Sequence, residues 1–390
     1  MKDHQYLFTS ESVSEGHPDK ICDQISDGIV DAYIERSDKK DQVRVACETM
    51  VTTNRVVIAG EVRGPVITSD EIENITRAIV KEIGYDQKNF HWEKFNFSCF
   101  LHGQSQDIAA GVDPSGNNSE GAGDQGIMFG YACTETKELM PAPIQYSHQI
   151  LKNLSKIRKN KEVYGLGPDS KSQVTLIYEE QIPVGCDNVV VSTQHKPDIS
   201  KSQIAEIVIP LIESSLPKGW MPMEDKILIN PTGRFEVGGP DGDTGLTGRK
   251  IIVDTYGGSC PHGGGAFSGK DPTKVDRSGA YVARYIAKNL VYAGLAERCT
   301  IQLAYAIGVT EPVSIYVNTH GTGKIDQSDL IKSINRVFDL TPRGINNMLE
   351  LSLPKYLSTA SYGHFGRNAK VEKTFTWEKT DKAKLILKEI

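Results

Sequence analysis

A glycine-rich stretch, Tyr256–Arg277, carries the residues of this chain that are best suited to bind phosphate. It reads YGGSCPHGGGAFSGKDPTKVDR and contains six glycines. Residues 263–265 are all glycine, so three bare backbone N–H groups can approach an anion. Its charged side chains are Lys270, Asp271, Lys274, Asp276 and Arg277. We expect the three cations to neutralise phosphate and the two acids to hold a divalent cation beside it, which predicts a nucleotide enzyme.

The same stretch is close to a P-loop but does not match it. Gly264, four residues, Gly269 and Lys270 fit the start of the P-loop pattern, yet Asp271 stands where that pattern needs a Ser or Thr to bind magnesium. A P-loop ATPase is therefore one alternative. A flexible surface loop is another, although such loops usually carry Ser and Asn without lysines at helical spacing.

Length and composition limit the class of protein. A chain of 390 residues is too long for one core and predicts two or three domains. A net charge of −6 without a long basic stripe argues against a nucleic-acid partner. We find no apolar run long enough to cross a membrane and no signal peptide, and the seven cysteines include no C-x-x-C pair. We therefore expect a cytoplasmic protein with reduced thiols and no membrane partner.

The hydrophobic pattern predicts the same order of elements more than once. In the first third we expect strands and helices in the order βαββαβ, over residues 5–10, a helix from Pro18, then 44–52, 55–62, a helix capped by Thr68 and Glu71, and 95–101. The middle third repeats the order over residues 126–132, 143–159, 172–178, 188–193, 200–216 and 226–230. The last third repeats most of it over residues 250–256, 277–293, 300–307, 313–318 and 327–338.

This repeat predicts the fold class and the domains. We expect an α/β (α+β) protein of three structurally similar βαββαβ two-layer domains in a pseudo-threefold arrangement. The N-terminal domain is placed at residues 1–103, the central domain at 124–242 and the C-terminal domain at 243–390. The polar, glycine-rich residues 104–123 join two domains as a linker or form a mobile lid.

A second candidate for anion binding lies where the first strand gives way to the first helix. His17 and Asp19 flank Pro18 in the segment GHPDK. Backbone N–H groups and the helix dipole favour bound anions at such a helix start. Asp19 could also give a carboxylate to Mg²⁺, which binds phosphates through one or two protein acids and water. A plain helix start is the alternative, and His17 favours the functional interpretation.

Several motifs in order resemble one family, the S-adenosylmethionine synthetases. They are Gly16–Lys20, Gly121–Gly126, Asn230–Lys250, Gly263–Asp271 and Tyr362–Arg367, and together they span nearly the whole chain. The resemblance implies three similar domains and a homodimer with active sites at the subunit interface, commonly paired into a homotetramer. It also implies that residues 104–123 form a lid rather than a linker.

In that family, methionine sulfur attacks C5′ of ATP and expels the whole triphosphate, which is then cleaved to pyrophosphate and phosphate. A thioether is nucleophilic without losing a proton, so the protein must mainly stabilise the leaving group. The resemblance therefore implies ATP and L-methionine as substrates, with two Mg²⁺ per site and one K⁺ per subunit.

Site residues are carried over from the family position by position. The implied catalytic residues are His17, at the breaking bond, and Lys171, Arg249, Lys270 and Lys274, with Arg249 linked to tripolyphosphate cleavage. The other residues implied to bind ATP are Asp169, Arg234, Phe235, Asp243, Lys250 and Ala266. The implied methionine-binding residues are Glu61, Gln104, Asp243 and Lys274, with Asp124 near the site. Asp19 and Asp276 would bind Mg²⁺, and Glu48 would bind K⁺.

Two other functions stay open at this point. One is a magnesium-dependent polyphosphatase, against which Glu61 and Gln104 argue. The other is a nucleotide-binding regulatory subunit of the same fold without catalysis, against which the full set of candidate cations argues.

Overall fold

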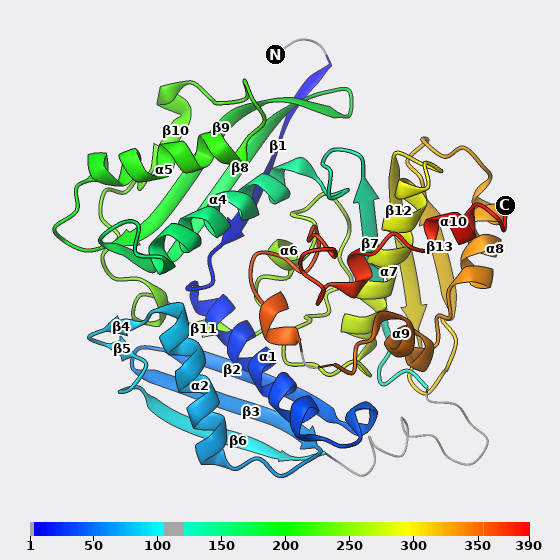
Figure 1. The fold of residues 1–390 in the computed structure, drawn as a ribbon, viewed down its shortest axis with the longest axis horizontal. Coiled ribbons are helices and arrows are strands. Elements are labelled where there is room, and N and C mark those ends of the chain that lie inside the picture. The colour runs from blue at the N-terminus through cyan, green and yellow to red at the C-terminus, as the bar shows by residue number, and fades with distance from the viewer. Residues whose placement is uncertain (1–3, 105–120, 354) are drawn as a thin grey trace.

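The computed structural model describes residues 4–104, 121–353 and 355–390 (Figure 1). Its N-terminal third has the expected order βαββαβ, with a small added hairpin. The elements are β1 (Gln5–Val13), α1 (Pro18–Arg36), β2 (Arg44–Thr52), β3 (Arg55–Arg63), α2 (Ser69–Ile83), β4 (Asp86–Gln87), β5 (Phe90–His91) and β6 (Asn96–Gly103). The predicted caps are present: α1 begins at Pro18, and Thr68 and Glu71 form a capping box on α2.

The central third repeats this order, with its second and third strands longer than predicted and its last strand shorter. Its elements are β7 (Gly126–Cys133), α4 (Ala142–Lys159), β8 (Leu166–Glu179), β9 (Ile182–His195), α5 (Lys201–Ser215) and β10 (Ile227–Ile229). Ser200 and Gln203 form a second capping box, on α5.

The last third departs from the prediction at its start. Its elements are β11 (Gly245–Leu246), α6 (Ile251–Asp254), α7 (Val275–Tyr292), β12 (Arg298–Tyr305), β13 (Ser314–Asn318), α8 (Gln327–Val337), α9 (Pro342–Leu349) and α10 (Ala383–Ile386). The strand predicted over residues 250–256 is wrong, because those residues form the short helix α6 and a turn. A short apolar run such as Ile251–Val253 fits either element, and here the Thr255 hydroxyl bonds back to the Ile251 carbonyl and closes a helical turn.

Each third lends its first strand to the sheet of another third. β1 pairs with β8 in the sheet β1-β8-β9-β10, β7 pairs with β12 in the sheet β13-β12-β7, and β11 pairs with β2 in the sheet β11-β2-β3-β6. The lent strand is antiparallel to its neighbour in all three sheets. The next pair is antiparallel too, and the two four-stranded sheets end on a parallel pair. The topology that the three sheets share supports the internal repeat. The order of elements along the chain does not predict that each first strand joins the sheet of another third.

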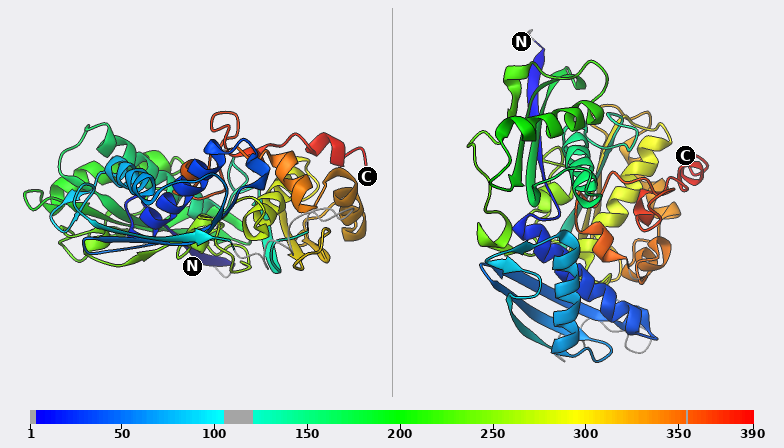
Figure 2. Two further views of the ribbon diagram at one scale, coloured as in Figure 1. Left: turned by 90° about the horizontal axis from the view of Figure 1, so that it is seen from below. Right: turned by 60° about the vertical axis from the view of Figure 1, so that its left-hand side comes forward.

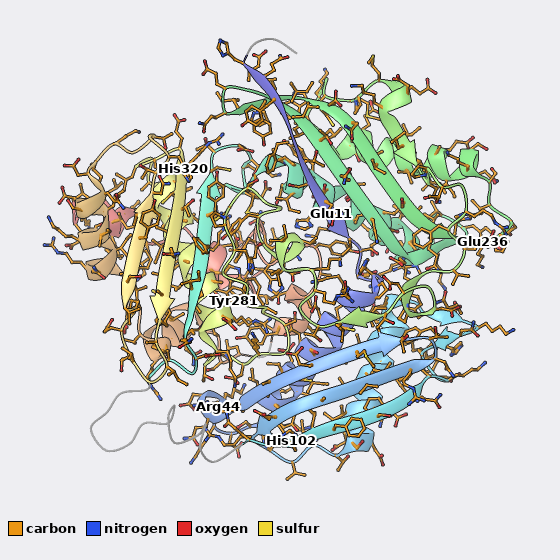
Figure 3. All side chains as sticks on the ribbon, turned by 180° about the vertical axis from the view of Figure 1, so that it is seen from behind. Glu11, Arg44, His102, Glu236, Tyr281 and His320 are labelled. Carbon is orange, nitrogen blue, oxygen red and sulfur yellow. The ribbon has the colours of Figure 1, made fainter. Side chains whose placement is uncertain are left out.

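The three units lie around a common centre. In Figure 1, α1, α4 and α7 lie toward the middle of the molecule and α2, α5 and α8 toward its periphery. The edge-on view in Figure 2 shows that the helices lie on one side of a plate and the sheets on the other. We call the sheet side without helices the outer face; Figure 3 views it, with Glu11 and His102 labelled there.

The outer face carries exposed apolar side chains from all three sheets. Strand residues alternate between faces, so Cys47 and Thr49 are buried toward the helices whereas Glu48 between them is exposed. Exposed apolar residues on the three sheets include Phe100 (63% exposed), Ile127 (45%), Leu228 (44%) and Leu246 (38%). No helix within the described part of the chain covers these residues, so the outer face is a candidate interaction surface.

Two apolar clusters hold the molecule together. The central unit has its own, built around residues such as Val174, Val191 and Ile204. The N-terminal and C-terminal units share the other, which includes Ile25, Ile58, Val282 and Leu303. Among the described residues, no helix combines the length and the apolar character that crossing a membrane requires.

Candidate active site

The first group of site residues surrounds the start of α1. His17 caps the helix, and its Nδ1 accepts a hydrogen bond from the backbone N–H of Asp19 at 3.1 Å. Burial, together with the nearby Lys250 ammonium, lowers the pKa of His17 to about 3. The ring is therefore neutral near pH 7. Because Nδ1 accepts, the ring proton is on Nε2, which is available as a donor.

Asp19 joins this helix start to the loop before α6. Its Oδ1 accepts from the Leu246 N–H at 3.0 Å, and its Oδ2 lies 2.5 Å from the Lys250 ammonium. The Arg249 guanidinium lies 4.0 Å from Oδ1. Burial raises the pKa of Asp19, but the Lys250 and Leu246 hydrogen bonds outweigh it, so the net pKa is lowered. Asp19 is thus an ionised carboxylate with two cations beside it.

The central sheet adds Lys171 and Asp169 from β8. Lys171 is exposed on the outer face, between buried Ser170 and Ser172, and its charge acts on both His17 and Asp169. Asp169 is buried; its Oδ2 accepts from the Gly239 N–H at 2.8 Å, whereas its Oδ1 has no hydrogen-bond partner among the described residues. Burial raises the pKa of Asp169 to about 6. A buried carboxylate oxygen without a partner is costly, which marks this position for a ligand.

The other expected adenosine residues lie on loops. The Phe235 N–H donates to His195 Nε2 at 3.2 Å. Asp243 Oδ1 accepts a hydrogen bond from the N–H of the next residue, Thr244, at 2.8 Å. Ala266 packs against Gly248, where an added Cβ would lie 2.5 Å from the Ala266 Cβ. Arg234 is different, because its side chain is 82% exposed and held by Glu236 at 2.7 Å.

A second group lies between the glycine-rich stretch and β2. The Lys270 ammonium lies 2.6 Å from Asp276 Oδ2, and the Lys270 backbone bridges to Ala46. Gly265 packs directly on Asp276, since an added Cβ would lie 2.4 Å from its Oδ1. Glu48 projects from β2 nearby. Its side chain is exposed, but the protein around it removes part of its water, which raises its pKa, and the charge of Lys270 partly opposes that change.

Two expectations for the glycine-rich stretch are wrong. Asp271 is fully buried and accepts hydrogen bonds from Val45 N–H, Thr273 and Lys274, so it serves the fold and cannot face a divalent cation. Arg277 is also fully buried, paired with Asp27 at 2.7 and 2.9 Å, and it brings no charge to a phosphate. The sequence showed their charge but not their burial. Lys274, 2.5 Å from Asp271, is half-buried beside them.

The expected methionine residues form a third group, on β3 and β6. Glu61 lies on β3, 3.9 Å from His102 Nε2 on β6. The Gln104 N–H donates to the Val62 carbonyl at 3.1 Å, and Gln104 Oε1 is buried without a partner among the described residues. Residues 105–120 of the expected lid lie outside the described residues.

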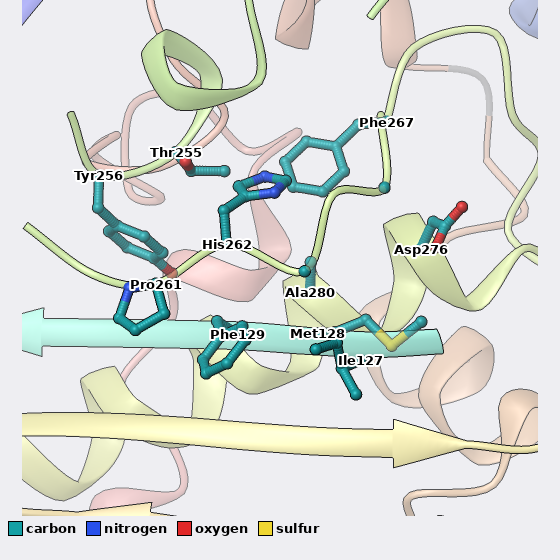
Figure 4. A pocket seen from close by; sticks show the side chains of 12 residues that line it. Ile127, Met128, Phe129, Thr255, Tyr256, Pro261, His262, Phe267, Asp276 and Ala280 are labelled. Carbon is teal, nitrogen blue, oxygen red and sulfur yellow. The ribbon is translucent and has the colours of Figure 1, made fainter. Parts of the chain in front are cut away.

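The glycine-rich stretch also closes a small pocket against β7, which is shown in Figure 4. The His262 ring lies over β7 between Thr255 and Phe267, and Asp276 lies at one end. The pocket has room for about one water molecule, far less than a nucleotide needs. Asp124, just before β7, is exposed and accepts from Gln125 N–H. This pocket is therefore too small to be the nucleotide site.

Taken together, the described residues form three groups of cations and carboxylates, contributed by all three units. The first group offers a neutral histidine donor, two cations and an unpartnered carboxylate oxygen. The second offers a lysine and two carboxylates, and the third a carboxylate and an unpartnered amide. Sequence reasoning missed the buried aspartates of α1 behind these groups, although their spacing of four residues was visible.

A three-unit α/β fold that gathers cationic and carboxylate side chains in its candidate site is the class that these observations define. Models of the N-terminal, central and C-terminal domains of S-adenosylmethionine synthetase match residues 5–106, 119–235 and 237–379. The chain is 60% identical over 382 residues to S-adenosylmethionine synthase 2 of Rhodospirillum rubrum, covering 98% of this chain and 97% of that protein. It is 59% identical over 381 residues to S-adenosylmethionine synthase of Rhodospirillum centenum, with 98% of each chain covered. The chain belongs to the S-adenosylmethionine synthetase family.

Proposed function

We propose that this protein is a methionine adenosyltransferase, which forms S-adenosylmethionine from ATP and L-methionine and uses water to hydrolyse the expelled tripolyphosphate to pyrophosphate and phosphate. Membership of the family supports the overall reaction. The observation that carries the roles of the residues is the first group, in which a neutral His17, Lys250 and Arg249 meet Asp19 at the start of α1.

The chemistry asks the protein to stabilise a leaving group rather than to activate a nucleophile. Methionine sulfur attacks C5′ of ATP, the C5′–O bond breaks, and the electron pair leaves on the triphosphate oxygen. His17 Nε2–H can donate to that oxygen, and a neutral donor suits a site already crowded with cations. Lys171, Arg249, Lys250 and Lys270 then neutralise the phosphates, with Arg249 acting in tripolyphosphate cleavage and Lys274 supporting the same region.

Substrate positions follow from the remaining groups. We assign ribose and adenine to Asp169, Phe235, Ala266 and Arg234, and the unpartnered Asp169 Oδ1 supports a hydroxyl donor there. We assign the methionine amino group to Glu61 and the rest of that substrate to Gln104 and Asp243, with Asp124 near the site. Arg234 would have to leave Glu236 to reach a nucleotide.

The residues also fit the metals that the family implies. No set of three His, Cys, Asp or Glu side chains in the described chain could hold an ion alone. Mg²⁺ at phosphates needs only one or two protein carboxylates, which Asp19 and Asp276 would supply, and both now hold lysine ammonium groups. Two Mg²⁺ would neutralise phosphate charge when bound, and Glu48 would give a carboxylate to K⁺.

A second copy of the chain completes this proposal. Lys171, Glu48 and Glu61 all project from sheet strands on the outer face, next to exposed apolar residues such as Phe100 and Leu246. Burying a face of this kind is favourable, and a symmetric dimer would place one chain's first group opposite the partner's sheets. We propose a homodimer with active sites in this interface, assembled further into a homotetramer, in the cytoplasm.

The test is one incubation with ATP, methionine, Mg²⁺ and K⁺. We expect S-adenosylmethionine, pyrophosphate and phosphate in equal amounts, and none of the three when methionine is left out. Phosphate released from ATP at the same rate without methionine would instead indicate a polyphosphatase. Bound nucleotide without any product would indicate a regulatory subunit.

A further inference from the structure

Four aspartates lie one helical turn apart on α1: Asp19, Asp23, Asp27 and Asp31. We call them the aspartate row. Residues four apart on a helix share one face and rise by about 6 Å, so the row is a regularly spaced set of acceptors. The first three are buried, and every member accepts from backbone N–H groups of the last third of the chain.

Asp23 holds the loop that carries the first pair of cations. Its Oδ1 accepts from the Gly248 N–H at 2.8 Å, and Gly248 directly precedes Arg249 and Lys250. Its Oδ2 lies 2.9 Å from the buried Lys20 ammonium, which also pairs with Asp254. Gly248 has φ +76° and packs on Ala266, so the peptide at this point is fixed from both sides.

Asp27 holds the backbone on both sides of Lys270. Its two oxygens accept from Gly269 N–H at 2.9 Å and Ser268 Oγ at 3.0 Å, and both also bind Arg277. Arg277 in turn donates to the Lys270 carbonyl at 3.0 Å. Since Arg277 follows Asp276, the Asp27–Arg277 pair sets the backbone positions of both partners of the Lys270–Asp276 ion pair.

Asp31 also accepts hydrogen bonds from backbone N–H groups, but it holds a segment that carries no site residue. Its carboxylate accepts from the N–H groups of Lys355, Tyr356 and Leu357 at 2.7, 2.7 and 2.8 Å. That segment carries none of the proposed substrate contacts. Asp31 is therefore a built-in control for what a buried aspartate on this helix contributes to folding alone.

We propose that Asp23 and Asp27 are positioning residues that fix the spacing of the phosphate-facing cations along α1 without touching the substrate. The inference rests on the proposed function, since it assumes that Arg249, Lys250 and Lys270 face a triphosphate. A displaced cation would stabilise the developing charge on the leaving group less well, so the rate should suffer more than ATP binding.

The experiment compares Asp23→Ala, Asp23→Asn and Asp31→Ala. Asparagine keeps an oxygen that can accept from Gly248, so it should restore most of the rate that alanine loses. We expect Asp23→Ala to lower kcat at least tenfold with the KM for ATP within about threefold, whereas Asp31→Ala lowers Tm but keeps kcat. Equal losses of kcat in the two alanine variants, or none in folded Asp23→Ala, would overturn the proposal.

A milder pair of variants covers the case in which Asp23→Ala does not fold. Ser268→Ala removes one hydrogen bond to Asp27, and Ser333→Ala removes a similar buried bond to Leu330 on α8. We expect roughly a two- to tenfold fall in kcat for the first only, as the loss of one hydrogen bond predicts. Equal kcat values in these two variants would count against the proposal.

The rise in Tm on adding tripolyphosphate gives a readout that does not depend on turnover. We expect wild type and Asp31→Ala to show the same rise and Asp23→Ala or Ser268→Ala a smaller one, because free tripolyphosphate carries the full leaving-group charge that ATP develops only in the transition state. If wild type forms no S-adenosylmethionine, the proposed function fails, and this comparison still decides the positioning roles. Equal rises in all variants would overturn them.

Discussion

The Lys250 ammonium lies 2.5 Å from Asp19 Oδ2, and this ion pair joins the first helix of the chain to the loop before α6. In the proposed reaction both partners act on the same phosphates: Lys250 would contact them directly, and Asp19 would act through Mg²⁺. When ATP and Mg²⁺ bind, Lys250 would exchange a carboxylate for a phosphate, and Asp19 an ammonium for a metal ion. The pair thus keeps each charge compensated before the substrate arrives.

Replacing Asp19 by asparagine should raise the Mg²⁺ concentration needed for half-maximal activity by about tenfold or more, equivalent to ~1.4 kcal/mol. Asparagine still accepts from the Leu246 N–H but no longer carries the charge that a divalent cation requires. Activity titrated with Mg²⁺ measures the shift. Asp329→Asn, on the surface of α8, should leave the curve unchanged, and an unchanged curve for Asp19→Asn would remove it from the metal site.

Lys270→Ala should lower kcat by about two to three orders of magnitude, the usual cost of losing one preorganised donor to a transition state. The KM for ATP should change by roughly threefold at most, because other cations still hold the ground-state phosphates. Steady-state kinetics measure both values. Lys332→Ala is the matched control, since Lys332 also pairs with an aspartate on a helix but is exposed. A KM for ATP raised by about two to three orders of magnitude, with kcat unchanged, would contradict a role of Lys270 in the transition state.

Acid should destabilise the protein through His17. Its native pKa is about 3, against an ordinary value of 6.5, so between these values the unfolded chain binds a proton that the native state excludes. Stability from this group is complete above pH 6.5 and falls as the pH drops toward 3, by about 2 kcal/mol at pH 5.

The measurement is Tm between pH 7 and pH 5 for wild type and His17→Asn. Asparagine keeps a helix-capping acceptor but does not titrate, so wild type should lose more stability than the variant over this range. The raised pKa values of Asp23 (about 7) and Asp169 (about 6) act in the opposite direction. Both aspartates are present in wild type and in the variant, so the difference between the two plots of Tm against pH reports the titration of His17. Parallel plots would mean that the pKa of His17 is the same in the native and the unfolded protein.

Phe100→Asp should break the proposed homodimer. Phe100 is 63% exposed on the outer face, so a charge there costs the monomer little but would be buried unpaired in the interface. Sedimentation equilibrium should show a folded monomer without transferase activity. Val371→Asp, at a 77% exposed position in the C-terminal segment, serves as the control. A fully active, unchanged oligomer would place the interface elsewhere.

The sequence predicted most elements of the fold because helix caps and periodic apolar residues are local signals. Thr68 with Glu71, and the isoleucines at 21, 25 and 29, act within a few residues of themselves. The pairing of β1 with β8 rather than with β2 depends on contacts more than 150 residues apart. No local pattern encodes such a choice. The short run at Ile251–Val253 was assigned to the wrong element for a different reason, because so short an apolar run fits a helix and a strand equally well.

The candidate site was predictable in its residue types but not in its burial. Charge alone made Asp271, Asp276 and Arg277 look alike, yet only Asp276 remains partly open to solvent. The difference arises because Arg277 is paired with Asp27 on α1, and Asp271 accepts a hydrogen bond from the Val45 N–H on β2. The roles assigned to the individual residues, the domain boundaries and the metals stay predictions until the experiments above are made.

The exchange of first strands has a consequence for how the chain can be divided. β1 leaves the first third for the second, β7 the second for the third, and β11 the third for the first, so the lending closes into a ring. Cutting the chain anywhere between two thirds strips an edge strand from one sheet and leaves another strand without its partner. A third taken alone would therefore carry a sheet that lacks its edge strand and a first strand that lacks its sheet.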